Sequence, residues 1–385
     1  MTWHISPENE GTGLPLEGVR VLDLSRVLAG PLCAMIAGDM GADVIKVEGP
    51  DGDPVRSLAP PRLGEDATYY LAVNRHRRNI VADLRDEVDF AAIEDLVRQA
   101  DAVVENYLPS QITSLGIERL RAANPQCVWV SITPASSGGP VARQPSFDLL
   151  AQARSGLMSV TGSADDEPTK VGAPLADVVT GLYGAVALMT GLVGRLRGNA
   201  ARHFEAPLLE STMSALVNQA QGYLSTGVNP TRLGNDHPSI APYGPFRTSD
   251  GYLLLAVGTD AQYAKLVRTL DDGELSSRSE WVANDVRITQ LAALRRSLDR
   301  IFSARTTDEW LELLSESGVP HGPIFDVASA FAQTQITDGD FVGSMSTPSG
   351  PTLAMRTPLL IDGVRPPIRS GPRRLGEDTG QILGS

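Results

Sequence analysis

Cysteine and histidine are scarce in this sequence, and their scarcity excludes several kinds of site. Among 385 residues there are two cysteines, Cys33 and Cys127, and no C-x-x-C pair. This usage favours a reducing compartment and two buried thiols over a disulfide. The five histidines lie far apart in the chain, with no H-E-x-x-H element or other paired metal-ligand spacing. We therefore expect no metal site.

Positive charge is also in short supply. The formal net charge is −13 at pH 7, so nucleic acid and anionic membrane are poor partners. The longest apolar stretch, 182–194, contains a threonine and three glycines and is well short of a membrane span. The N-terminus has no apolar segment that would mark export, so we expect a cytoplasmic protein without a membrane partner. An anionic ligand must be held by backbone amides or local cations, of which 74–79, "NRHRRN", is the one dense cluster.

What the chain does contain is a repeated strand–helix rhythm. Its length of 385 residues is enough for two domains. In the first 150 residues, short apolar runs alternate with helical patterns, which predicts a doubly wound α/β domain. The predicted strands lie at 18–25, 43–50, 77–84, 101–107 and 126–132. Long helices are predicted at 178–197 and 208–227, and the turn-rich segment 228–246 marks a domain boundary.

The turn after the first predicted strand lacks a nucleotide-binding fingerprint. It reads S-R-V-L-A-G-P over 25–31, without G-x-G-x-x-G, and Leu28 would obstruct a pyrophosphate. A dehydrogenase is therefore disfavoured, which leaves a plain strand–helix turn or a backbone surface for another ligand. No G-x-S-x-G elbow is present and neither cysteine has a neighbouring histidine, so serine and cysteine nucleophiles are disfavoured too.

One carboxylate, Asp177 in "VGAPLADVVTGLYG", lies between a proline-containing turn and an apolar helix. The simplest interpretation is an N-cap that accepts a hydrogen bond from the amide of Val179 or Thr180, and the local pattern favours it. The helix that follows, however, carries four glycines between 181 and 194, each costing about 1 kcal/mol against alanine. Such glycines indicate the close approach of another helix or a ligand, and a helix N-terminus can also hold a nucleophilic carboxylate.

Long stretches of the sequence resemble the family III CoA-transferases. The similarity runs in order along nearly the whole chain through "LEGVRVLDLSRVLAGPLCAMIAGDMGADVIKVEGPDGDPVR", "YYLAVNRHRRNIVADLR", "ADAVVENYLPS", "FDLLAQARSGLMSVTG", "GAPLADVVTGLYGAVAL", "HPSIAPYGPFRTSDGYLLLAVG", "TTDEWLELLSESGVPHGPI" and "GPRRLGEDTG". The resemblance implies an interlocked homodimer of ring-like chains, each with a Rossmann-like large domain. On this basis 1–227 is the large CoA-binding and catalytic domain, 228–335 a smaller α+β domain, and 336–385 a segment returning to the large domain.

The resemblance also implies that Asp177 is the nucleophile. Its carboxylate attacks an acyl-CoA thioester, which gives an acyl-aspartyl anhydride and the CoA thiolate. The thiolate then attacks the aspartyl carbonyl, so an enzyme-bound CoA thioester forms while the first acid leaves, and an acceptor acid reverses these steps. The implied substrates are an acyl-CoA and a carboxylic acid acceptor, and no permanently bound cofactor is implied.

The same resemblance points to residues that contact CoA. They lie in the first turn and at the C-terminal ends of the third and fourth predicted strands: Leu28, Ala29, Ala82, Asp83, Leu84, Arg85, Asn106, Tyr107 and Leu108. Some members have basic residues where this chain has Tyr107 and Ser114, so the phosphates need other partners. The candidates are Arg75, Arg77, Arg78 and Arg85.

Phe147 and Asp148 are implied to lie beside the substrate and its oxyanion. Leu28 replaces the glutamine of formyl-CoA transferases, and 228–246 lacks their glycine-rich lid. We therefore expect a larger, less polar acid than formate or oxalate.

Two alternatives stay open. An α-methylacyl-CoA racemase of the same superfamily needs two acid–base groups on opposite faces of the α-carbon, and the racemases have a histidine where Phe147 stands. A benzyl group cannot carry a proton, which favours the transferase, although His237 could stand in. The other alternative is a CoA-binding homologue without catalysis, for which the missing basic residues argue. Transfer of CoA between two carboxyls of one substrate is also left open.

Overall fold

The computed structural model describes residues 2–199 and 201–384, and its contacts divide the chain into two compact units. Unit 1 comprises Met1–Leu157, Val171–Val228 and Thr334–Ser385, and unit 2 comprises Met158–Lys170 and Asn229–Gln333. Each unit has its own buried apolar core.

Unit 1 is built on a six-stranded sheet in which the strands are parallel and follow the order β5-β2-β1-β6-β7-β8. The strands are β1 (Arg20–Asp23), β2 (Asp43–Glu48), β5 (Arg77–Val81), β6 (Ala102–Glu105), β7 (Val128–Thr133) and β8 (His203–Pro207). The chain adds strands outward from β1 on one side and then continues from β6 on the other, so the direction of winding reverses between β1 and β6. The predicted α/β class with a parallel central sheet is confirmed.

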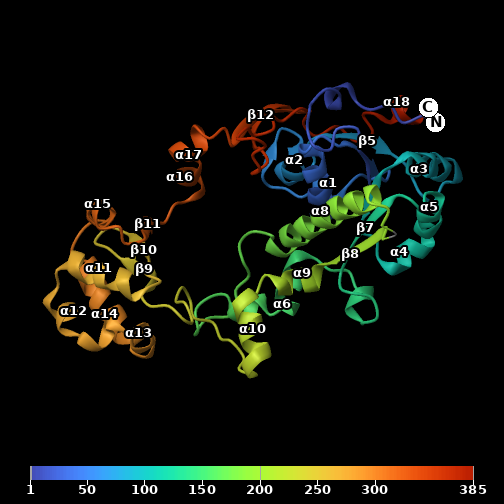
Figure 1. Cartoon of the computed structure of the whole chain (residues 1–385). Coiled ribbons are helices and arrows are strands. Elements are labelled where there is room, and N and C mark those ends of the chain that lie inside the picture. The colour runs from blue at the N-terminus through green and yellow to red at the C-terminus, as the bar shows by residue number, and fades with distance from the viewer. Residues whose placement is uncertain (1, 200, 385) are drawn as a thin grey trace. The chain divides into compact units, whose positions relative to one another are not determined.

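Helices cover both faces of this sheet, as Figure 1 shows. Leu22 and Ile45 belong to a core with α3 (Glu87–Gln99) and α5 (Ile117–Ala123). Their strand neighbours Val21 and Val44 belong to a second core with α1 (Ala29–Asp39) and α8 (Leu175–Leu196). Because both faces of these strands are covered, their apolar residues alternate between the two cores, beside buried charged residues such as Asp43 and Lys46.

Helix α8 packs closely on α1 and on the sheet because glycines lie at the contacts. A Cβ at Gly181 would lie 2.8 Å from the carbonyl oxygen of Ala29, and a Cβ at Gly191 would overlap Val128 of β7. The close approach expected from these glycines is therefore real, and the neighbours at these two positions are α1 and β7.

Helix α8 has 22 residues and is long and apolar enough to cross a membrane by length and composition. From the sequence, the run 182–194 is expected to be too short for a membrane span. In unit 1 the helix contacts α1, β7, β8 and α9 (Leu208–Ser214). In its most apolar 18-residue stretch, 44% is buried. The core helix of a globular protein can be as long and as apolar as a membrane span. The contacts of α8 within unit 1 therefore account for its apolar composition.

Two elements of unit 1 differ from the prediction. Strand β8 was not predicted; it pairs with β7 at the sheet edge, and His203 and Glu205 are exposed, so it lacks an apolar run. The single helix predicted at 208–227 is two helices, α9 and α10 (Val217–Thr226). Val217 has a positive φ of 39°, and a right-handed helix cannot continue through such a residue.

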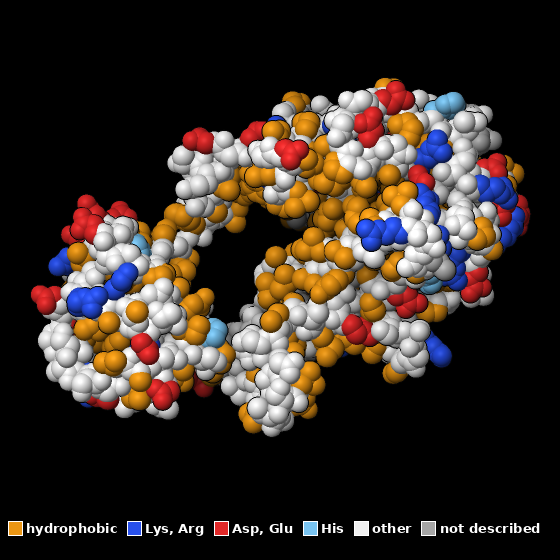
Figure 2. Space-filling model, in the orientation of Figure 1, with side chains coloured by type: hydrophobic (Ala, Val, Ile, Leu, Met, Phe, Trp, Pro, Cys, Tyr) orange, Lys and Arg blue, Asp and Glu red, His pale blue; other side chains and the backbone are white. Residues whose placement is uncertain are grey.

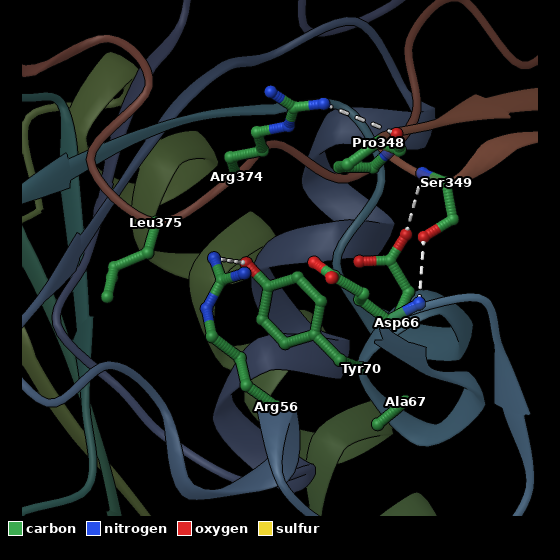
Figure 3. A pocket seen from close by; sticks show the side chains of 9 residues that line it. Arg56, Asp66, Ala67, Tyr70, Pro348, Ser349, Arg374 and Leu375 are labelled. Atoms are coloured by element: carbon green, nitrogen blue, oxygen red, sulfur yellow. Dashed lines mark hydrogen bonds between the residues drawn. The ribbon is translucent and has the colours of Figure 1, made fainter.

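The last residues of the chain pack on unit 1. The hairpin β12 (Val342–Thr347) and β13 (Gly350–Met355) reaches a pocket in which the Ser349 amide donates to Asp66 at 3.0 Å (Figure 3). The Ser349 hydroxyl accepts a bond from the Glu65 amide at 3.2 Å. Before α18 (Thr379–Leu383), the Asp378 carboxylate accepts a bond from the Asn79 amide of β5 at 2.8 Å. These contacts hold the segment that follows unit 2 in sequence against unit 1.

Unit 2 combines a three-stranded antiparallel sheet, in the order β11-β10-β9, with helices. Its main elements are β9 (Tyr243–Arg247), β10 (Tyr252–Ala256), β11 (His321–Pro323), α11 (Asp260–Leu270), α14 (Leu291–Phe302) and α15 (Thr307–Ser317). Helix α15 begins at a capping box of Thr306 and Glu309 and ends at Gly318, which has a positive φ. Residues 158–170 also pack in unit 2, where the Arg232 guanidinium donates to the carbonyl oxygens of 163, 164 and 166.

Candidate active site

The site lies in unit 1, where the winding of the sheet reverses. The turn after β1 and the residue after β6 meet there: the Arg26 amide donates to the Asn106 side-chain oxygen at 3.0 Å, and the Asn106 amide group donates to the Arg26 carbonyl at 2.8 Å. In open parallel sheets, ligands bind outside the carboxyl ends of the strands at this reversal. The topology alone therefore marks this crevice.

A cavity of about 380 Å³ opens at this point. Among the residues singled out from the sequence, the cavity wall brings together Leu28, Ala29, Asn106, Leu108, Phe147 and Asp177. The side chains of the first turn contribute little accessible surface, since Leu28 is only 3% exposed. Phe147 is 61% exposed and precedes the first residue of α6 (Asp148–Arg154).

Asp177 is the third residue of α8, and it does not cap the helix. The preceding cap position is Pro174, and the orphan amides are taken by Asp148, which accepts bonds from Ala176 at 2.8 Å and from Asp177 at 3.4 Å. Gln152 donates to the other oxygen of Asp148 at 2.7 Å. Among the described residues, none donates a hydrogen bond to the Asp177 carboxylate. The N-cap interpretation of Asp177 is wrong, because a carboxylate distant in sequence performs that task.

Asp148, which the resemblance places beside the substrate and its oxyanion, is bonded to the start of α8. Its carboxylate accepts bonds from two amides and one side chain. Both oxygens are therefore engaged as acceptors, and an oxyanion needs donors. Asp148 supports the start of α8 instead.

The surroundings of Asp177 disfavour its charged form. Partial burial, and then the negative charge of Asp148, raise the pKa of Asp177 to about 7. The same two carboxylates act on Tyr69, whose pKa is raised to about 12, first by burial and then by Asp177 and Asp148. A carboxylate without hydrogen-bond donors and with little hydration is a better nucleophile than one in water, and near neutral pH about half of it is ionised.

The remaining residues predicted to contact CoA differ in their accessibility. Ala82 is 3% exposed, and Leu84 and Tyr107 pack against the core shared with α3 and α5. Arg85 is exposed and forms a bidentate pair with Asp83, with both N–O distances 2.8 Å. Of these side chains, the Arg85 guanidinium is thus the one placed to meet a phosphate from solvent.

The structure contradicts the prediction that Arg75 and Arg78 bind phosphate. Arg75 forms a bidentate pair with Asp39 at 2.7 and 2.6 Å, and Arg78 pairs with Asp43 at 2.6 Å. Both arginines are less than 10% exposed. Arg77 is buried as well and is paired with Asp23 at 2.6 Å. The basic cluster neutralises buried carboxylates of α1, β1 and β2, because β5 lies beside β2 in the sheet.

Sequence reasoning missed Arg26. It is the single lysine or arginine among the described residues that line the cavity, and its guanidinium lies 5.4 Å from the centre of the Tyr107 ring. Its position two residues before Leu28 in the first turn was the available signal. His237, the other residue considered for proton transfer, belongs to unit 2, where its ring lies 5.4 Å from that of Tyr243.

Comparison with known proteins identifies the family. The sequence model of CoA-transferase family III matches residues 16–379. The chain belongs to this family. It is 35% identical to succinyl-CoA:glutarate CoA-transferase of Homo sapiens, over 99% of this chain and 88% of that protein. It is 36% identical to succinate–glutarate CoA-transferase of Agrobacterium fabrum, over 96% of this chain and 95% of that protein.

The fold agrees with this assignment. A crystal structure of a CAIB/BAIF family protein from Brucella suis superposes with a TM-score of 0.85 at 37% identity, and covers 96% of this chain and 99% of that one. The protein is therefore a family III CoA-transferase, an enzyme for which CoA is part of the substrate.

Proposed function

We propose that this family III CoA-transferase moves CoA between dicarboxylic acids through a covalent intermediate on Asp177. The single observation that carries the proposal is the state of Asp177: it lies in the cavity wall at the sheet's reversal point, unbonded by any described donor and with a pKa raised to about 7. The names of two relatives, both CoA-transferases of succinate and glutarate, support dicarboxylates. This departs from the less polar acid expected from the sequence.

The reaction follows from the chemistry of a carboxylate and a thioester. An Asp177 oxygen attacks the thioester carbonyl, the C–S bond breaks, and an acyl-aspartyl anhydride and the CoA thiolate result. The thiolate attacks the aspartyl carbonyl of the anhydride, which releases the donor acid and leaves CoA bound to Asp177 as a thioester. The acceptor carboxylate attacks this thioester, and the released thiolate takes the acceptor's acyl group from the new anhydride. Asp177 returns as a free carboxylate, and no water is consumed.

The residues around Asp177 suit these steps. Asp148 and α8 fix the backbone of the nucleophile without bonding to its carboxylate, so both oxygens stay free to attack. Bound acyl-CoA would displace water from the cavity, and water would otherwise hydrolyse the anhydride. Arg26 supplies a positive charge for an anionic part of the bound substrate.

The structure gives less support to two other functions, a racemase and a CoA-binding protein without catalysis. A racemase needs a proton carrier at Phe147, which lines the cavity but has no ionisable group. A binding protein without catalysis has no use for this carboxylate, because a partly buried carboxylate with a raised pKa costs stability and gains nothing by binding an anionic thioester.

We also propose that the enzyme is a homodimer. Apolar side chains are exposed along α8 and α10 of unit 1, and Figure 2 shows the hydrophobic atoms over α8. They are Leu182, Tyr183, Val186, Val193, Tyr223 and Leu224. A surface of this kind is typical of a subunit interface. Sedimentation should give a dimer for the wild type and for Val88→Glu, an exposed control on α3, and a lower mass for Val186→Glu.

The activity is tested by chromatography of CoA esters after mixing succinyl-CoA with a panel of acids. The panel contains glutarate, other dicarboxylates and monocarboxylates of equal chain length. We expect glutaryl-CoA from the wild type and none from Asp177→Asn, which keeps the shape of the side chain. Transfer by Asp177→Asn, or deuterium entering the α-carbon of an acyl-CoA from heavy water without transfer, would contradict the proposal.

A further inference from the structure

The turn between β1 and α1 contains a β-branched residue in the left-handed region of backbone space. Val27 has a φ of 71°, which crowds the side chain of any residue except glycine. The turn is also folded tightly on itself, since a Cβ at Gly30 would overlap Ser25. Strained residues persist where the surroundings hold them and where their geometry is used. Here the turn forms part of the wall of the cavity that contains Asp177.

Two buried charges hold this turn. The Val27 amide donates to both oxygens of Asp53, at 3.2 and 3.3 Å. The Lys46 ammonium donates to the carbonyl oxygen of Ser25 at 2.8 Å and lies 3.0 Å from Asp53. Lys46 and Asp53 therefore bind the peptide groups on either side of Arg26, while Asn106 binds Arg26 itself.

Neither Lys46 nor Asp53 reaches the cavity, although Asp53 also accepts a hydrogen bond from the Val55 amide at 3.1 Å. Both side chains are 0% exposed, and neither belongs to the cavity wall. A buried ion pair gains little net stability over two apolar side chains of similar size. What it does supply is a fixed geometry, here that of the peptide groups of Ser25 and Val27.

We propose that Asp53 and Lys46 are positioning residues that clamp the strained Val27 turn and thereby set how the thioester meets Asp177. Leu28 and Ala29 follow Val27 directly and line the same cavity, so a relaxed turn moves that wall relative to Asp177. The inference rests on the proposed function, because it assigns the turn a task in the attack of Asp177 on the thioester.

The clamp is tested with Asp53→Asn, Val27→Gly and the double variant. Glycine adopts a positive φ without strain, so Val27→Gly removes the need for the clamp. Asp51→Asn is the matched control, an exposed carboxylate in the same loop. The first readout is the rate of succinate release in a single turnover with saturating succinyl-CoA, well below the melting temperature. The second is the thermal midpoint of each protein.

We expect Asp53→Asn to slow succinate release about tenfold or more, since small misplacements of reacting groups have effects of this size. Asp51→Asn should stay close to the wild type. The double variant should release succinate nearly as fast as Val27→Gly alone and clearly faster than Asp53→Asn. A destabilised but correctly shaped site would lower the midpoint without slowing a single turnover of folded enzyme.

Several results would overturn the clamp. It is wrong if Asp53→Asn releases succinate as fast as Asp51→Asn, or if the double variant is as slow as Asp53→Asn. If Asp53→Asn does not fold, folding of the double variant supports the clamp and its failure to fold contradicts it. If the wild type releases no succinate, the proposed function has failed. The thermal midpoints then still test the clamp. If the clamp exists, Val27→Gly must raise the midpoint of Asp53→Asn by more than it raises that of the wild type.

Discussion

Replacing Asp177 with asparagine should stabilise the protein at neutral and alkaline pH while it abolishes CoA transfer. Burial and the nearby Asp148 raise the pKa of Asp177 from 3.8 to about 7, so the folded protein binds this proton more tightly than the unfolded chain does. The raised pKa favours folding at low pH, and this advantage is lost as the pH rises from about 4 to about 7. The loss amounts to about 4 kcal/mol, at about 1.4 kcal/mol for each pKa unit. Asparagine has no charge to bury, so the variant does not lose this stability as the pH rises.

The measurement is urea denaturation of the wild type and Asp177→Asn between pH 4 and pH 8.5. The two proteins should be similarly stable near pH 4, and the variant should become more stable by up to about 4 kcal/mol above pH 7. Asp51→Asn, an exposed carboxylate, controls for the general effect of losing a negative charge. A difference that does not change with pH, or a wild type that is more stable at pH 8, would refute the reasoning.

Three further predictions concern the same unit. The kcat/KM for acyl-CoA should fall as the pH drops through about 7, because protonated Asp177 cannot attack the thioester. Asp148→Asn should move the inflection of this pH–rate profile to lower pH. An unmoved inflection would show that Asp148 does not raise the pKa of Asp177. Gly181→Ala places a Cβ 2.8 Å from a main-chain carbonyl oxygen of α1, so thermal denaturation should show a loss of about 1–3 kcal/mol, and an unchanged midpoint would contradict the close packing. Arg75→Gln removes the arginine that pairs with the buried carboxylate of Asp39, so the free energy of unfolding should fall by about 3–5 kcal/mol without a change in the KM for acyl-CoA. Arg26→Gln, in the cavity wall, should instead raise that KM and leave the thermal midpoint nearly unchanged.

The central fold could be predicted because the strands are apolar on both faces and the helices between them are amphipathic. Strand β8 escaped prediction because it is an edge strand, in which His203 and Glu205 face solvent and leave no apolar run. The break between α9 and α10 depends on one backbone angle at Val217, which no local sequence pattern announces.

The site was predictable in its nucleophile and less so in its surroundings. Asp177 stood out through the motif around it, yet the residue that caps its helix is Asp148, 29 residues earlier in the chain. Only the folded chain brings the two carboxylates together and raises the pKa of Asp177. A cluster such as "NRHRRN" is ambiguous in the same way, because its partners, carboxylates of α1, β1 and β2, are distant in sequence. Carboxylates in otherwise apolar strands and helices, such as Asp39 and Asp43, were the available signal that buried cations must exist.

The most direct test of the account is the mass of the intact protein after mixing with succinyl-CoA and hydroxylamine, beside Asp177→Ala. The account predicts a hydroxamate adduct on the wild type that maps by peptide fragmentation to Asp177, and none on the variant. An adduct on another residue, or full transfer activity with no trapped intermediate on Asp177, would contradict the covalent role of this carboxylate.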